Sequence, residues 1–191
     1  MGFIKSSLFI SLDGVIESPE TWHFPYFDDQ MGAVVGEMMS DNDAILIGRH
    51  TYDAFASYWP NADPADPTTE VMNGTRKYVV SNTLTDPEWE NTTVLSGDFM
   101  SEIRALKATS GGELQVHGSS MLIAALLEEG LVDEMTLLTI PIVLGQGRRL
   151  FPAAGPDLAL DLVESRVDSK GLAIHVYRPK GRPQYYQLPT G

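Results

Sequence analysis

The sequence contains no cysteine, which excludes disulfide bonds and thiolate metal sites and fits a cytoplasmic protein. Positive charge is scarce as well: 13 Lys and Arg stand against 26 Asp and Glu, for a net charge of -13. A chain this acidic is a poor ligand for nucleic acid or anionic membranes. No apolar run reaches about 18 residues, so we expect no transmembrane helix. The first residues, MGFIKSSLFISLDG, are too polar for a signal peptide, and we expect a cytoplasmic location.

The 191 residues suffice for one domain with a sizeable core. Apolar residues make up 43% of the chain and charged residues 20%, which is typical of a globular protein. No internal repeat and no change of composition marks a second domain. We therefore expect a single domain over residues 1–178, followed by a C-terminal tail at 179–191.

The stretch Glu113–Glu134 combines the features of an anion site. It begins as a short strand at 114–116, turns through His117-Gly118-Ser119-Ser120, and continues as a helix with apolar residues at helical spacing. Ser119 or Ser120 can cap the helix start, and Gly130 is placed to end it. Free backbone N–H groups and the positive end of the helix dipole favour a phosphate there. The alternative is an ordinary tight connection between a strand and a helix.

Hydrophobic patterns predict strands that alternate with helices. The expected strands are 3–12, 44–47, 77–80, 92–95, 114–116, 135–140, 158–165 and 172–177. Helices are expected after Asp28 or Asp29, with a methionine stripe facing the core, and again after Gly48, Asp98 and Ser120. Residues 60–75, rich in proline and aspartate, are expected to form a surface loop. This order predicts an α/β fold with a mixed, mainly parallel central sheet, antiparallel C-terminal strands and flanking helices.

An aromatic loop at 17–29 follows the first expected strand and contains Trp22, Phe24, Tyr26 and Phe27. Such a loop can be a lid or wall over a planar ligand. The alternative is a satellite hydrophobic cluster beneath a long loop.

Three expected strands are followed by small, polar or basic residues: Gly48-Arg49-His50-Thr51, Ser81-Asn82 and Gly118-Ser119-Ser120. Ligands of open α/β sheets bind beyond the carboxyl ends of the strands, so these ends can hold an extended phosphorylated ligand such as a dinucleotide. The basic residues available to such a ligand are Arg49, His50, Arg76, Lys77, Arg148 and Arg149, with a solvated surface charge as the alternative for each. The usual G-x-G-x-x-G motif is absent, and the four histidines lack the spacing of a metal site, so we expect no metal.

Several short motifs, taken in order, resemble the dihydrofolate reductase-like fold and, within it, the reductase domain of riboflavin biosynthesis. They are Ser11-Leu12-Asp13-Gly14-Val15-Ile16, Ile47-Gly48-Arg49-His50-Thr51-Tyr52, Val80-Ser81-Asn82, Val116-His117-Gly118-Ser119-Ser120, Leu131-Val132-Asp133-Glu134, Pro141-Ile142-Val143-Leu144-Gly145-Gln146-Gly147 and Leu150-Phe151. Each motif is weak alone, but the ordered set is fairly specific. The resemblance implies a three-layer sandwich and a reductase whose family substrate is a phosphoribosylamino-uracil.

The resemblance also implies NADPH as the hydride donor. The residues that match the cofactor-binding positions are Gly48, Arg49, Thr51, Ser81, Asn82, Gly118, Ser119 and Ser120. Among them, Arg49 and Thr51 match phosphate contacts, Ser81 and Asn82 lie near the 2′-phosphate, and the turn at 118–120 holds the diphosphate.

For the chemistry, the resemblance places Asp13 beside the nicotinamide and the substrate. Asp13 or Asp28 is a candidate to relay a proton, and Trp22 and Phe24 are candidates for the substrate wall. For Asp13 the alternative is an ordinary turn residue in an Asp-Gly pair. Relatives are often dimers, so we expect a homodimer that acts on a small molecule.

The sequence also departs from its relatives. His117-Gly118-Ser119-Ser120 stands where they often have a run of glycines. Folate reductases carry a carboxylate on their first helix. The possible counterparts here are Glu37, further along that helix, and Asp28 or Asp29 at its start. A true folate reductase, a non-catalytic NADP-binding module and a protein-interaction module therefore stay open as alternatives.

Overall fold

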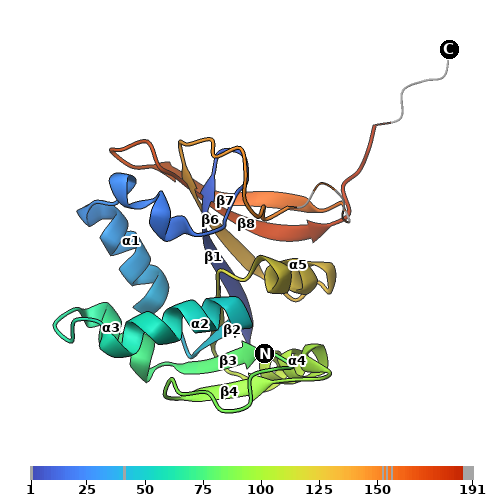
Figure 1. The fold of residues 1–191 in the computed structure, drawn as a ribbon. Helices are drawn as coiled ribbons and strands as arrows, with labels where there is room; N and C mark the ends of the chain where they lie inside the picture. The colour runs from blue at the N-terminus through green and yellow to red at the C-terminus, as the bar shows by residue number, and fades with distance from the viewer. Residues whose placement is uncertain (1, 41, 152, 154, 156, 187–191) are drawn as a thin grey trace.

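The computed structural model describes residues 2–40, 42–151, 153, 155 and 157–186 (Figure 1). Its strands are β1 (Phe3–Ser11), β2 (Ala44–Gly48), β3 (Arg76–Val80), β4 (Thr92–Leu95), β5 (Glu113–His117), β6 (Glu134–Ile140), β7 (Ala159–Val167) and β8 (Ala173–Gly181). Its helices are α1 (Asp29–Ser40), α2 (Arg49–Tyr58), α3 (Pro67–Gly74), α4 (Phe99–Thr109) and α5 (Ser120–Glu128), with short 3-10 turns at Pro19–Thr21, Phe24–Tyr26 and Trp59–Asn61.

All eight strands form one sheet in the order β4-β3-β2-β5-β1-β6-β8-β7. The first six strands of the chain run parallel, whereas β8 pairs antiparallel with β6 and β7 antiparallel with β8. The sequence-based prediction of a mainly parallel sheet with antiparallel C-terminal strands is therefore confirmed.

Helices cover both faces of this sheet, because side chains alternate between two sets of core residues. In β2, Leu46 packs with α4 and α5 in one hydrophobic cluster, whereas Ile45 and Ile47 pack with α2 and α3 in another. In β1, Leu8 faces the α4–α5 side, and Phe9 faces a third cluster that includes residues of α1. The expected three-layer arrangement is confirmed, and the methionine stripe of α1 belongs to the core as predicted.

The expected surface loop at 60–75 was wrong in its second half, which forms α3. The Asp66 carboxylate accepts a hydrogen bond from the Thr68 amide at 2.8 Å, and Pro67 occupies the first turn, where its missing N–H costs nothing. Met72 is fully buried against β2 and β3. Proline and aspartate here start a helix, although in the sequence they looked like loop residues.

The grouping of Lys77 with the ligand-accessible basic residues was also wrong. The side chain is fully buried at the start of β3, where its ammonium donates hydrogen bonds to the carbonyl oxygens of Asn73 at 2.7 Å and Glu90 at 3.0 Å. The ammonium also lies 4.2 Å from the ring centre of Trp89. Burial lowers the pKa of Lys77 to about 8.

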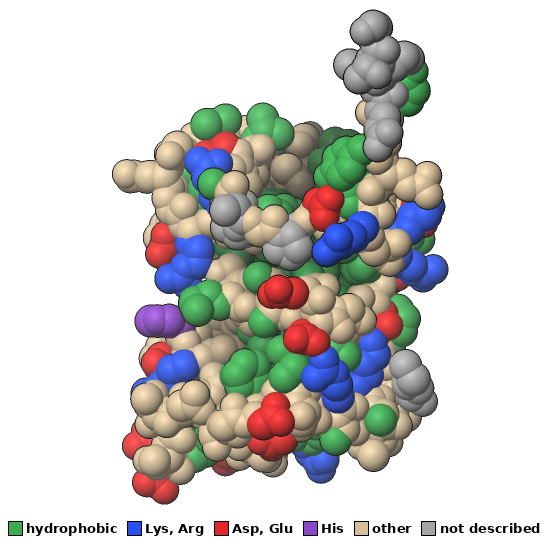
Figure 2. All heavy atoms as spheres, turned by 90° about the vertical axis from the view of Figure 1, so that its right-hand side faces the viewer, with side chains coloured by type: hydrophobic (Ala, Val, Ile, Leu, Met, Phe, Trp, Pro, Cys, Tyr) green, Lys and Arg blue, Asp and Glu red, His purple; other side chains and the backbone are tan. Residues whose placement is uncertain are grey.

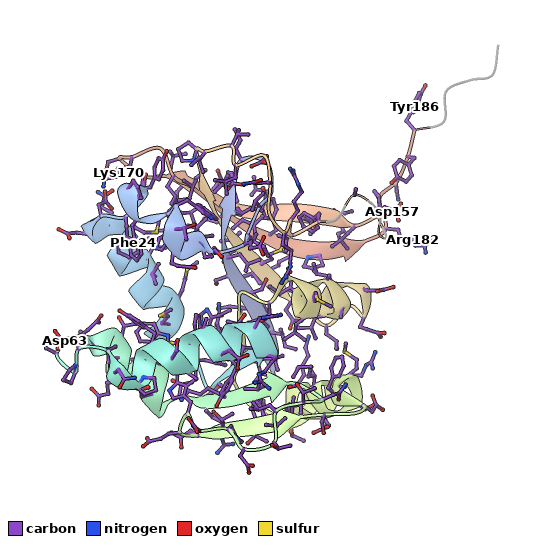
Figure 3. The ribbon with its side chains drawn as sticks, viewed as in Figure 1. Phe24, Asp63, Asp157, Lys170, Arg182 and Tyr186 are labelled. Carbon is purple, nitrogen blue, oxygen red and sulfur yellow. The ribbon has the colours of Figure 1, made fainter. Side chains whose placement is uncertain are left out.

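Figure 2 views the side of the molecule that carries α5, β8 and β7, where apolar side chains lie between acidic and basic ones. Strand β8 continues to Gly181, three residues into the expected tail. Arg182 and Tyr186 then lead away from the sheet (Figure 3), and the expected tail residues 187–191 lie outside the described residues. None of the described helices is long and apolar enough to cross a bilayer.

Candidate functional site

Three neighbouring strands bring the three polar strand ends to one edge of the sheet. The order β3-β2-β5 places Ser81, Gly48 and Gly118 at the carboxyl ends of adjacent parallel strands. Helix α2 begins directly after β2, and two residues separate the end of β5 from the start of α5. Two helix N-termini, each with unpaired backbone N–H groups, therefore start at the same place.

A short hydrogen-bond chain joins these two helix starts. The Ser119 hydroxyl oxygen accepts a hydrogen bond from the Gly48 amide at 2.8 Å and lies 2.8 Å from the Thr51 hydroxyl oxygen. We call the group Gly48, Thr51, Gly118 and Ser119 the β2–β5 cradle. Ser119 occupies the N-cap position of α5, but its side chain makes no capping hydrogen bond, so the predicted side-chain cap was wrong. The end of α5 was predicted correctly, because Gly130 has a positive φ and the Leu131 amide donates to the Leu126 carbonyl at 2.8 Å.

Glycine leaves room at two points of the cradle, and at Gly118 the backbone conformation also favours it. A Cβ atom on Gly118 would lie 3.1 Å from the Thr51 hydroxyl oxygen, and a Cβ on Gly48 would lie 3.2 Å from the Ser119 hydroxyl oxygen. Gly118 also has φ +58°, a conformation that disfavours any side chain. Because both positions lack side chains, a phosphate can approach the backbone N–H groups closely, so the cradle fits a dinucleotide diphosphate.

Arg49 lies at the rim of the cradle, where its exposed guanidinium is already paired. Its Nε donates to the two carboxylate oxygens of Asp53 at 2.7 and 2.9 Å. The side chain also lines a pocket of about 540 Å³ beside α2, together with Tyr52 and Trp89. Three acidic residues, Asp53, Asp86 and Glu88, line the same pocket.

Ser81 and Asn82 stand beside this pocket, and their oxygen atoms are used within the protein. The Ser81 hydroxyl accepts hydrogen bonds from the Thr83 and Leu84 amides at 3.2 and 3.1 Å. The Asn82 side-chain oxygen accepts from the Gly97 amide at 2.8 Å. A phosphate at this end would therefore meet the Ser81 hydroxyl proton and the Asn82 amide NH₂, which are donors.

Asp13, a candidate proton relay, holds two loops together. Its carboxylate accepts hydrogen bonds from the Ser11 hydroxyl at 2.7 Å and from the Leu144 and Gly145 amides at 3.1 and 2.9 Å, and Arg149 pairs with it from the far side. The Ser11 hydroxyl and the Leu144 amide, followed by the other donors, lower the pKa of Asp13 to about 2. A carboxylate so well hydrogen-bonded is ionised at neutral pH and is a poor proton donor.

Asp28, the second candidate, caps helix α1 as the sequence indicated. One carboxylate oxygen accepts from the Met31 amide at 3.0 Å, and the other accepts from the Ser169 hydroxyl at 3.3 Å. The Met31 amide is the main cause that holds the pKa of Asp28 below its usual value.

The two aromatic candidates of the 17–29 loop differ in exposure. Trp22 is buried in the core cluster of α1, and its indole N–H donates to the Glu17 carbonyl at 3.0 Å, so it does not face a ligand. Phe24 is 62% exposed, and Figure 3 labels it in this loop. The loop rests on the sheet through His23, whose ring stacks on Phe9 with 4.6 Å between ring centres. The satellite cluster is therefore the better description for Trp22, whereas Phe24 is accessible.

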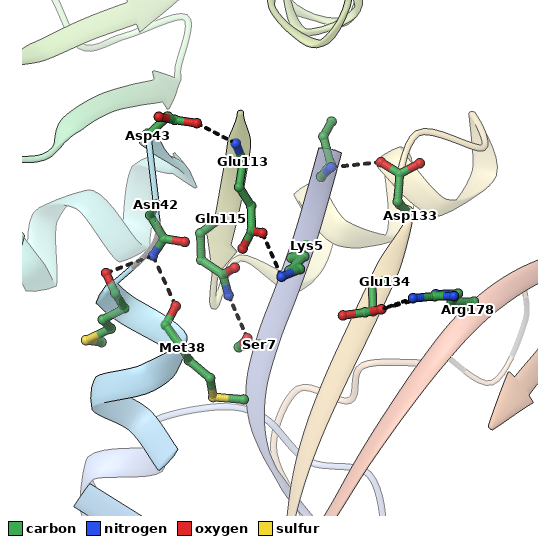
Figure 4. Close-up of polar contacts among 12 residues, drawn as sticks. Lys5, Ser7, Met38, Asn42, Asp43, Glu113, Gln115, Asp133, Glu134 and Arg178 are labelled. Carbon is green, nitrogen blue, oxygen red and sulfur yellow. Dashed lines mark hydrogen bonds and ion pairs between the residues drawn. The ribbon is translucent and has the colours of Figure 1, made fainter. Parts of the chain in front are cut away.

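A row of polar side chains crosses the middle of the sheet on the face that carries α1 and α2. We call Lys5, Ser7, Glu113, Gln115 and His117 the polar strip. Lys5 pairs with Glu113 at 2.6 Å, and the Gln115 amide donates to the Ser7 hydroxyl at 2.6 Å (Figure 4). Polar residues at every second position of β1 and β5 are the sequence signal for this strip, which was not among the predicted sites.

Folate reductases place a carboxylate from the first helix in the substrate site. Here Glu37 lines a pocket of about 360 Å³ between α1 and the turn that joins β7 to β8, together with Arg166 and Asp168. That pocket lies away from α2 and from the cradle. Among the described residues, no three His, Asp or Glu side chains gather as a metal site.

The sheet order and the cradle together define an α/β protein of the dihydrofolate reductase-like type. The sequence profile of the RibD C-terminal domain matches residues 3–174, and the chain belongs to this family. Similarity to a curated protein agrees: the uncharacterized protein YyaP of Bacillus subtilis (strain 168) is 32% identical over 183 residues, with 91% of this chain and 93% of that protein covered.

Solved structures show the same fold. A protein of Shewanella sp. PV-4 described as a riboflavin biosynthesis protein superposes with a TM-score of 0.72 and 26% identity, covering 93% of this chain and 99% of that chain. RibD of Acinetobacter baumannii superposes with a TM-score of 0.67 and 19% identity, covering 94% of this chain and 58% of that chain. The chain thus spans little more than half of the Acinetobacter protein, and that likeness concerns the fold.

Proposed function

We propose that this chain is an NADPH-dependent reductase of the riboflavin-biosynthesis reductase type. The observation that carries the proposal is the β2–β5 cradle, where two helix N-termini and two glycines meet at the carboxyl edge of a parallel sheet. An acidic chain that binds an anionic dinucleotide needs such a local site, because its overall field repels anions.

Different residues of the site would bind different phosphate groups of the dinucleotide. Gly118, Ser119 and Ser120 would hold the diphosphate through backbone N–H groups, and Thr51 through its hydroxyl. Gly48, whose amide is bonded to the Ser119 hydroxyl, would leave room for the diphosphate beside it. Arg49 would turn its remaining N–H groups to a phosphate beside the pocket lined by Tyr52 and Trp89. Ser81 and Asn82 would donate hydrogen bonds to the same phosphate as Arg49.

When bound, the reduced nicotinamide would supply a hydride to a heterocyclic or sugar-imine substrate. The protein's part is to hold the two rings together over the polar strip and to exclude water, with Phe24 as a wall. We assign structural roles to Asp13, whose carboxylate joins two loops through three hydrogen bonds, and to Asp28, whose carboxylate caps helix α1. The position of Glu37 in the other pocket disfavours the folate reductase alternative.

We further propose a homodimer, which the edge strand β7 supports. Among the described strands β7 pairs only with β8, and its residues 161–167 are all exposed. Leu162, Val163 and Val167 are 56%, 48% and 65% exposed, an apolar surface that a second copy would cover. Light scattering after gel filtration tests this: the wild type should elute as a dimer, and Val167→Lys should shift it to monomer. A monomeric wild type would overturn the assembly.

The reductase proposal is tested by titrating the protein with NADPH and NADH and following nicotinamide fluorescence. We expect NADPH-selective binding that weakens about tenfold or more in Arg49→Ala, because a charge-assisted contact is lost. Arg104→Ala is the matched control, since Arg104 is also an exposed arginine paired with a carboxylate, that of Glu129, but lies on α4. Failure of both nucleotides to bind would overturn the proposal. Binding without oxidation by pyrimidines, pterins or small carbonyl compounds would instead favour the non-catalytic module.

A further inference from the structure

The polar strip ends in a side chain whose hydrogen bonding is incomplete. Lys5, Glu113, Ser7 and Gln115 are paired with each other across β1 and β5. His117 continues the strip at the carboxyl end of β5, opposite Ser7. Its Nε2 atom is buried and has no hydrogen-bond partner among the described residues.

The burial of His117 makes this gap unusual. The residue is only 7% exposed, so water does not replace the missing partner at its surface. Buried polar atoms are nearly always hydrogen-bonded, and an unpaired one lowers stability. When such an atom stands beside a candidate binding site, the missing partner is a candidate ligand atom.

The position of the ring places it in the proposed site. His117 directly precedes Gly118 of the cradle, and its ring faces α2, with 6.5 Å between its centre and that of Phe55. The hydrophobic clusters of α1 and of α2–α3 lie on this same face, and the polar strip runs between them. A ligand whose phosphates occupy the cradle would therefore carry its ring system toward His117.

The ring is an uncharged partner, because desolvation lowers the pKa of His117 to about 4. A neutral imidazole offers one N–H donor and one acceptor nitrogen. Such a group complements the edge of an amide or lactam, which also presents one N–H and one C=O, and it offers no charge for a carboxylate or phosphate.

We infer that His117 is a ligand-binding residue beside the β2–β5 cradle, whose Nε2 hydrogen-bonds the amide-type edge of a flat, uncharged ring. The inference rests on the proposed reductase function for the location of the ring. Two sources carry this edge: the carboxamide of the nicotinamide, or a lactam of the substrate. For either ligand group, we predict that His117 strengthens binding and lowers the stability of the unliganded protein.

The experiment compares wild type with His117→Leu and with His117→Gln, in which an amide reaches the place of Nε2. His175→Leu is the control, because His175 is also a strand histidine but is half-buried, lies on β8 and has its ring tilted against that of Tyr177. Each protein is titrated with NADPH, with ADP-ribose 2′-phosphate, which keeps the phosphates and lacks nicotinamide, and with uracil and N,N′-dimethyluracil in the presence of NADP⁺. Urea unfolding of each protein is measured in parallel.

We expect His117→Leu to unfold at the same or higher urea concentration than wild type and to bind about tenfold more weakly, since one hydrogen bond is lost. If the partner is the nicotinamide carboxamide, His117→Leu should bind NADPH more weakly but ADP-ribose 2′-phosphate as well as wild type does. If the partner is a lactam of the substrate, His117→Leu should bind uracil more weakly, and wild type should bind N,N′-dimethyluracil, which lacks the N–H groups, more weakly than uracil. Either pattern, with recovery in His117→Gln, supports the inference.

Wild-type affinities in His117→Leu for both NADPH and uracil would overturn it, as would a loss of stability without a loss of binding. If wild type binds neither NADPH nor ADP-ribose 2′-phosphate, the reductase proposal fails. The uracil titrations then test the role of His117 by themselves. If wild type does not bind uracil either, this inference is overturned as well.

Discussion

The Ser119 hydroxyl oxygen lies 2.8 Å from the Gly48 amide nitrogen, although the two residues are 71 positions apart in the chain. The bond joins the last residue of β2 to the residue before α5. It turns two separate strand-to-helix connections into one structural unit. The shape of the candidate phosphate site depends on it.

Replacing Ser119 with alanine should therefore affect both stability and binding. The Gly48 amide loses its acceptor, and we expect the free energy of unfolding to fall by about 1–3 kcal/mol. Urea unfolding measures this change, and an NADPH titration of the same protein should show weaker binding. Ser119→Gly is the informative control, because it loses the same bond but relieves the φ of +58°. Equal stabilities of Ser119→Ala and wild type would contradict the assigned role of the hydroxyl.

Gly118→Ala separates backbone strain from obstruction of the site. Gly118 and Gly130 have similar φ values, +58° and +64°, so alanine at either should cost about 1 kcal/mol of stability. Only at Gly118 would the new Cβ meet a neighbour, the Thr51 hydroxyl oxygen at 3.1 Å, whereas Gly130 has open space. We expect NADPH binding to weaken about tenfold or more in Gly118→Ala and to stay unchanged in Gly130→Ala. Equal affinities in the two variants would remove the cradle from the binding site.

Asp13 should make the free energy of unfolding depend on pH in the acidic range. Its folded pKa of about 2 lies below the usual value of 3.8, so its contribution is fully present above about pH 4 and is lost as the pH falls toward 2. Asp13→Asn should lower the free energy of unfolding at neutral pH, and its difference from wild type should shrink between pH 4 and pH 2. Urea unfolding across this range measures it, with the exposed Asp86→Asn as control. A difference that stays constant to pH 2 would contradict the assignment.

Lys77→Met should mainly destabilise the protein, because Lys77 itself lines no part of the proposed site. The carbonyl oxygens of Asn73 and Glu90 would lose their donor, at a cost of about 1–3 kcal/mol. NADPH affinity should fall much less than in Arg49→Ala, because Lys77 lies at the amino end of β3, opposite the edge that carries the cradle, and reaches the pocket only through the ring of Trp89. Arg76→Met, at the exposed neighbour, should change neither quantity. A loss of NADPH affinity in Lys77→Met as large as that in Arg49→Ala would return Lys77 to the candidate phosphate ligands.

Much of the fold could be read from local patterns. The alternation that places Ile4, Leu8 and Ile10 on one face of β1 is set by the period of a strand, and it predicted that strand almost to its ends. The segment at 67–74 was missed, because Pro67 and Asp66 favour both loops and helix starts, and only the burial of Met72 distinguishes the two.

The site was predictable in its backbone and less so in its side chains. The strand ends at Gly48 and Gly118 were recognisable, since small residues between a strand and a helix have a local signature. The use of the Ser119 hydroxyl was not, because it depends on β2 and β5 being neighbours. The same holds for Asp13, whose partners Leu144 and Gly145 come from a loop 131 and 132 positions further along the chain.

The strand order also determines when the protein can fold during its synthesis. β1 is made first, but its two neighbours are β5 and β6, so no partner strand exists until residues 113–140 have been translated. β2 can pair with β3 earlier, but β2 and β1 are joined only when β5 has inserted between them. The first strand therefore has both edges unpaired until β5 has been synthesised, and open strand edges make the growing chain more prone to aggregation than the folded protein.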